Sequence, residues 1–128
     1  MNPLLVGNLR REGETYMKRL INSVTQFNAN ELSALKSSLE DGCRQWLINN
    51  GFPEVRENQY DVCVDDMLPT IWMSEDSGRL RIELGMELGY DSMLDLAFNY
   101  LDPIIVRYDN DAYFDMADSG LMVAYLDN

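Results

Sequence analysis

The chain has 128 residues, carries a formal net charge of −12 and contains no histidine. This length suits one domain, and an apolar content of 46% excludes a chain that is disordered throughout. The lack of histidine excludes Ser-His-Asp and Cys-His catalysis and histidine metal sites, and no Gly-rich phosphate-binding loop is present. We therefore expect a protein that is not an enzyme and that needs no cofactor.

The charge is distributed unevenly along the chain. Residues 1–57 contain seven basic and seven acidic side chains, whereas residues 58–128 contain three basic and fifteen acidic ones. Twelve of these fifteen acids are aspartate, which carries its charge on a short stem close to the backbone. The sequence predicts a single domain over residues 1–128, with a charge-balanced helical part (1–57) and an acidic sheet part (58–128).

Two helices are predicted in the first part. Apolar residues recur at helical spacing from Glu12 to Phe27. Asn28 is then a suitable N-cap for a second helix, with Glu31 three residues later, and the segment "NNGFP" predicts its end. The apolar side of this second helix consists of Leu32, Leu35, Leu39, Cys43, Trp46 and Leu47. The two helices would form a hairpin that packs on another element.

The apolar period changes from 3.6 to 2 in the second part. Residues 58–87 predict a three-stranded antiparallel meander, with its cleanest alternation in "RLRIELGME". The segment "YDSMLDLAFNYLDP" predicts a short helix that Asp91 caps and Pro103 stops. Two or three strands are expected around "IIVRY", "AYFDM" and "LMVAYL".

These elements predict an α+β fold. In it, the N-terminal helical hairpin packs on a mainly antiparallel sheet of five to six strands, and one short helix is inserted between the meander and a C-terminal hairpin. Helices would cover one face of the sheet, and the other face would be acidic and partly open. No apolar run has the length of a membrane helix, the start does not resemble a signal peptide, and Cys43 and Cys63 are expected to be free thiols, so we expect a cytoplasmic protein.

The acidic residues are the main candidate site, and two interpretations of them stay open. In the first interpretation, they serve only to keep the protein soluble and to prevent edge-to-edge pairing of strands. Alternatively, they form a negative patch that fits a basic partner, because aspartate is a poor strand former and such conflicts with propensity occur at functional positions. The partner-binding candidates are Asp61, Asp65, Asp66, Asp76, Asp109, Asp111, Asp115 and Asp118.

The sequence contains three weaker candidates for a site. The segment "DNDAYFD" has aspartates for a calcium or magnesium ion but lacks the glycine and the distal glutamate of an EF-hand loop, so we expect no metal site. Acidic pairs such as Asp65 with Asp66 occur by chance in so acidic a segment, so they do not indicate acid–base catalysis. Tyrosines near the acids, among them Tyr113 and Tyr125, fit either ordinary packing or a binding surface.

The chain resembles two classes of protein. Its charge pattern is similar to that of the DNA-mimic, anti-restriction and anti-CRISPR inhibitors of phages and mobile elements, and to that of toxin-immunity proteins. The element order from about 31 to 126 is similar to that of the class I chaperones of type III secretion, with "CVDDMLPTIWMSEDSGRLRIELG" as the first meander and "AYFDMADSGLMVAYL" as the last hairpin.

The leading hypothesis is a non-enzymatic inhibitor that presents aspartates as surrogates of phosphate groups. Its partner would be a basic protein, a nuclease or a nucleoprotein effector, and it would bind neither nucleic acid nor membrane. A homodimer is compatible with the pattern. The alternative is a small acidic secretion chaperone that binds a segment of an effector.

Overall fold

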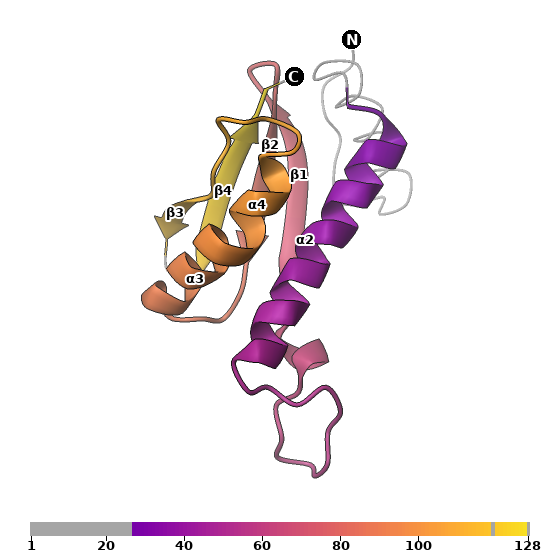
Figure 1. Cartoon of the computed structure of the whole chain (residues 1–128), viewed down its shortest axis with the longest axis vertical. Coiled ribbons are helices and arrows are strands. Elements are labelled where there is room, and N and C mark those ends of the chain that lie inside the picture. Colours follow the sequence, from indigo (N-terminus) through magenta and orange to yellow (C-terminus); the bar gives the residue numbers. More distant parts are fainter. Residues whose placement is uncertain (1–26, 119, 128) are drawn as a thin grey trace.

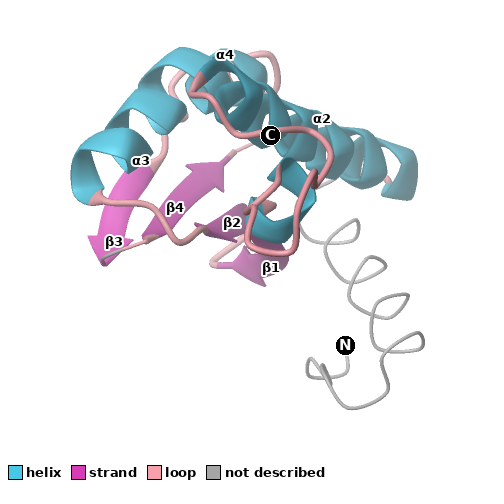
Figure 2. Cartoon of the chain, turned by 90° about the horizontal axis from the view of Figure 1, so that it is seen from below, coloured by secondary structure: helices cyan, strands magenta, loops and turns pink. Residues whose placement is uncertain are grey.

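The computed structural model describes residues 27–118 and 120–127, and within them it shows an α+β fold (Figure 1). Four antiparallel strands form one sheet in the order β1-β2-β4-β3 in this part of the chain. The helical segments of the described residues lie together on one side of that sheet, as Figure 2 shows. The predicted α+β fold class is therefore confirmed.

Helix α2 (Ala29–Asn49) has both ends where the sequence predicts them. The side chain of Asn28 accepts a hydrogen bond from the Glu31 N–H, and the Glu31 side chain accepts one from the Asn28 N–H. At the other end Gly51 has a positive φ of 91°, and the N–H of Phe52 donates to the carbonyl of Leu47. All six predicted core residues of this helix are buried.

The first hairpin consists of β1 (Thr70–Asp76) and β2 (Arg79–Gly85). Leu80, Ile82 and Leu84 are fully buried, as the alternation predicts, and face the helices. A two-residue turn joins the strands, with positive φ at both Ser77 and Gly78. Strands β3 (Asp115–Asp118) and β4 (Leu121–Leu126) form the second hairpin, and β4 lies between β2 and β3.

The predicted strand near residues 58–66 is wrong. This region is a loop followed by the short 3₁₀ helix η1 (Val64–Met67), so the predicted meander has two strands. Tyr60 and Val62, which alternate with acids as in a strand, are exposed instead of facing the core. Asp61 and Asp66 use their carboxylates to accept backbone N–H groups of this loop, and such side-chain bonds compete with strand pairing.

The predicted strand around residues 104–108 is also wrong, because the preceding helix continues through it. Helix α3 (Tyr90–Leu96) leads into the π-helical turn η2 (Ala97–Leu101) and then into α4 (Asp102–Ile105). Pro103 stands in the first turn of α4, where a proline is tolerated, and does not stop the helix. The cap residue is Gly89 and not Asp91.

The number of strands is therefore four, and not five or six, in the described residues. The predicted first helix of the hairpin, residues 12–27, lies outside the described residues except for Phe27, which is buried and packs against Tyr108. The two cysteines are free and buried. None of the helices in the described part is long and apolar enough to cross a membrane.

Candidate functional site

A groove of about 460 Å³ lies on the open side of the sheet, where β2, β4 and β3 meet the loop before β3. We call it the acidic groove because it is lined by four aspartates: Asp109, Asp111, Asp115 and Asp127. Three of the four are among the residues predicted from sequence. The groove is also lined by Arg79, Arg81, Tyr113 and Tyr125.

Asp109 fixes the rim of this groove through both of its carboxylate oxygens. One of its carboxylate oxygens accepts the N–H of Asp111 at 3.0 Å, which closes a local turn. The other oxygen accepts the N–H of Asp127 at 2.8 Å, at the end of β4. Asp109 thus fixes the loop to the last strand and brings the side chains of Asp111 and Asp127 to one rim.

The remaining aspartate of the groove belongs to the sheet edge. Asp115 begins β3 and pairs in register with Val123 of β4, on the face that the helices leave open. Asp111 and Asp115 are exposed, as is Asp127. Within residues 27–118 and 120–127, no hydrogen bond or ion pair engages the carboxylates of these three residues. Their charges therefore face solvent.

Two arginines form the floor of the groove. The guanidinium carbon of Arg79 lies 4.3 Å from the centre of the Tyr125 ring, and that of Arg81 lies 6.0 Å from it. Arg81 donates to the Tyr125 hydroxyl at 3.2 Å and forms an ion pair with Glu83. These bonds raise the pKa of Arg81, the bond to Tyr125 most strongly. The two arginine side chains thus contact Tyr125 and Glu83, and they form no ion pair with the four aspartates of the groove.

Three of the predicted contact residues belong to the segment 50–67 between α2 and β1, and this segment lies at the bottom of Figure 1. Asp61 accepts the N–H groups of Glu57 and Asn58 at 3.0 and 3.1 Å. Asp65 forms an ion pair with Arg44 at 3.1 Å. Asp66 accepts the N–H of Cys63 and pairs with Arg56, and these contacts, the backbone bond first, lower its pKa. All three serve local structure.

The last two predicted residues stand at hairpin ends. Asp76 closes the β1–β2 turn, where it accepts the Ser77 hydroxyl at 3.2 Å and pairs in register with Arg79. Asp118 ends β3 and is exposed. The eight predicted aspartates therefore do not form one array, and the structure brings together Asp109, Asp111 and Asp115.

Sequence reasoning missed Asp127 and the arginine floor of the groove. Arg81 of β2 pairs in register with Tyr125 of β4, and nothing in the sequence showed that these two residues lie side by side. It also missed Asp102, which accepts the N–H of Phe114 at 2.9 Å and whose pKa is raised by its partial burial. Its position before Pro103 resembled a helix end, which concealed its role in fixing the loop before β3.

Among residues 27–118 and 120–127, no cluster of three or more cysteine, aspartate or glutamate side chains is arranged to hold a metal ion. Burial, together with the nearby Glu40, raises the pKa of the Cys43 thiol to about 12, so this thiol stays protonated and is a poor nucleophile.

In comparisons with known proteins, no family model, no curated protein and no solved structure matches the chain.

Proposed function

We propose that the protein is a non-enzymatic acidic inhibitor that binds a basic surface of a nucleic-acid-handling protein. The contact surface is the exposed rim of the acidic groove, formed by Asp111, Asp115 and Asp127, extended along the sheet edge by Asp118. The observation that carries this proposal is that three solvent-facing carboxylates gather around one hollow and have no hydrogen-bond or ion-pair partner among residues 27–118 and 120–127, in a segment with a net charge of −12.

The rim has the properties that phosphate mimicry requires. Aspartate places its charge close to a backbone that is fixed by the sheet and by the Asp109 bonds, so little side-chain conformational freedom is lost on binding. A basic cleft that accepts nucleic acid attracts such charges and releases its counterions in the same way. Nucleic acid itself is repelled by the same rim.

The contact set is narrower than the sequence predicted. Asp61, Asp65, Asp66 and Asp76 are engaged in bonds that hold loops and turns, so we assign them to local structure. Asp109 is a positioning residue, because both of its carboxylate oxygens accept backbone N–H groups. Neutralising it would disturb the rim as well as remove a charge.

The test begins with the full chain as bait at about 50 mM NaCl, followed by a binding titration with each purified partner. The affinity should fall steeply between about 50 and 200 mM NaCl. The triple variant Asp111→Asn, Asp115→Asn, Asp127→Asn should weaken binding roughly tenfold or more and reduce the salt dependence, because three steering charges are removed.

A matched control removes three exposed acids elsewhere: Asp41→Asn, Glu54→Gln and Asp91→Asn. It has the same net charge as the rim variant and should bind within about threefold of wild type, since charges outside the contact surface contribute little to the affinity. Equal losses in both variants would show a net-charge effect without a defined site. Binding that tolerates salt and responds only to apolar substitutions would contradict the inhibitor and point to the chaperone alternative.

A further inference from the structure

The two edges of the sheet differ in how they are protected from pairing with another strand. The edge strand β3 has four residues, an irregular register between Met116 and Asp118, and exposed acids. Short length, irregularity and charge are the usual means of protecting an edge. The edge strand β1 has seven residues in unbroken register with β2, and its acids, Glu75 and Asp76, are confined to its last two positions.

The backbone of β1 presents three residues to its free edge. The N–H of Met86 donates to the carbonyl of Gly120, so the even-numbered residues of β2 bond to β4. The odd-numbered residues of β2 therefore bond to β1, through Thr70, Trp72, Ser74 and Asp76. This leaves the N–H and C=O groups of Ile71, Met73 and Glu75 directed outward, and no strand of the described residues pairs with them.

We propose that a second copy of the chain covers this edge, and that the two β1 strands pair antiparallel about a two-fold axis at Met73. In this register Met73 pairs with its own copy, and Ile71 pairs with Glu75 of the second copy. Every outward N–H and C=O group of the three residues is then satisfied in both copies. The two sheets join into one across the axis.

The charges and side chains of β1 favour self-pairing in this direction. Because both acids stand at one end of the strand, the antiparallel arrangement sets that end beside the uncharged Thr70 and Ile71. Asp76 lies opposite Thr70 of the second copy, and Trp72 lies opposite Ser74. No acid faces an acid across the axis, as like charges would in a parallel pairing.

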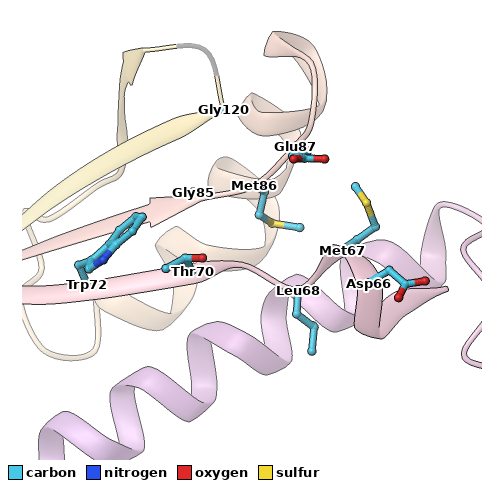
Figure 3. Close-up of a pocket in the computed structure, with 9 residues that line it drawn as sticks. All are labelled: Asp66, Met67, Leu68, Thr70, Trp72, Gly85, Met86, Glu87 and Gly120. Carbon is cyan, nitrogen blue, oxygen red and sulfur yellow. The ribbon is translucent and has the colours of Figure 1, made fainter. Parts of the chain in front are cut away.

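A hollow at the start of β1 gives the second copy a place to pack. It has a volume of about 370 Å³ and is lined by Met67, Leu68, Thr70, Trp72 and Met86, among others (Figure 3). The Trp72 side chain is 51% exposed, and its ring lies over Gly85. The proposed register carries the Ser77–Gly78 turn of the second copy past Leu68 and Pro69, alongside this hollow.

This inference goes beyond the proposed function, because it uses the opposite edge of the sheet and leaves both acidic grooves accessible. The two proposals also respond to salt in opposite ways. Each copy carries a charge of −12, so added salt screens their repulsion and should favour the dimer, whereas it weakens binding to a basic partner.

The test is sedimentation equilibrium of the full chain over a wide concentration range at about 0.05 and 0.5 M NaCl. We expect a monomer–dimer equilibrium that shifts to the dimer at high salt. Thr70→Asp places an acid opposite Asp76 at two symmetric positions and should weaken dimerisation roughly two- to thirtyfold. Thr70→Lys places a base there and should strengthen it. Thr70 is exposed, so neither change disturbs the core.

Two further variants complete the design. Met73→Pro removes an outward N–H, which an edge strand tolerates, and should give a folded monomer. Ser33→Asp adds the same charge as Thr70→Asp on the exposed side of α2 and should leave the equilibrium nearly unchanged. A full chain that stays monomeric at both salt concentrations, or a dimer that ignores the substitutions at Thr70, would overturn the proposal. The Thr70 pair remains decisive if Met73→Pro fails to fold.

Discussion

Asp66 and Asp102 belong to the same acidic segment, but their contributions to the stability of the fold depend on pH in opposite directions. The N–H of Cys63 and the Arg56 guanidinium lower the pKa of Asp66, so its contribution is present above the ordinary value of 3.8 and is lost as the pH falls through its folded pKa. Burial raises the pKa of Asp102 above the same value. Its contribution is full below 3.8 and is lost as the pH rises through its folded pKa.

We predict the pH dependence of two variants from these directions. Asp102→Asn keeps an oxygen that accepts the Phe114 N–H but cannot ionise, so it should gain stability relative to wild type as the pH rises above 3.8. Asp66→Asn should be less stable than wild type at neutral pH, and the difference should shrink as the pH falls below 3.8. Urea unfolding from about pH 3 to 7 measures both differences, because the other acids cancel between the proteins. Parallel pH curves for wild type and either variant would contradict the assigned cause.

At the level of elements, two glycines in hairpin turns are required for different reasons. Gly120 has a φ of 72°, and a Cβ added there would lie 2.6 Å from the carbonyl oxygen of Met86. Gly78 has a φ of 83°, but a Cβ there would meet nothing within 4 Å. The turn before β4 is therefore closed by a tight approach to β2, whereas the β1–β2 turn needs only the left-handed conformation.

Replacing each glycine by alanine should separate the cost of the left-handed conformation from the cost of the close contact with Met86. Gly78→Ala should lower the free energy of unfolding by about 1 kcal/mol, the cost of a left-handed alanine. Gly120→Ala should lower it by about 2–4 kcal/mol, because the contact with the Met86 carbonyl must also be relieved and the β2–β4 pairing shifts. Thermal or urea unfolding gives both values. Equal losses would mean that the contact at Gly120 is relieved at no cost.

Elements were predictable where local and tertiary preferences agree. Helix α2 has a capping box, one apolar side and a glycine end, and all of these features are local in the sequence. The run Ile104–Val106 has the composition of a strand, but Ile104 and Ile105 are buried at the end of a helix that continues through a π-turn. A Cβ added at Gly42 of α2 would lie 3.1 Å from the Leu101 side chain and 3.2 Å from the Ile104 side chain. Sequence periodicity does not reveal such a close approach of two helical segments.

At the level of the whole molecule, the sequence predicted the acidic excess but not its arrangement. Asp109, Asp111 and Asp115 were predicted as members of a set of eight aspartates in the acidic part of the chain. The pairing of β2 with β4 and the bonds of Asp109 are what bring Asp127, Arg79 and Arg81 beside these three. Asp61 and Asp66 resembled contact residues, because a capping carboxylate and a binding carboxylate have the same sequence appearance.

The gathered charge of the groove should also have a cost in stability. Asp111, Asp115 and Asp127 face one hollow, so their mutual repulsion opposes folding more than the same charges dispersed over the surface. We predict that the triple asparagine variant at these positions has a higher melting temperature than wild type at about 20 mM NaCl, and that the difference largely disappears at about 0.5 M NaCl, where the Debye length falls to a few ångströms.

The control with Asp41→Asn, Glu54→Gln and Asp91→Asn should gain less at low salt. Differential scanning calorimetry of the three proteins at both salt concentrations makes the comparison, and equal gains for the two variants would show that net charge, and not the groove, determines the repulsion. A larger gain for the rim variant would indicate that the fold maintains an unfavourable concentration of charge at the surface that we assign to partner binding.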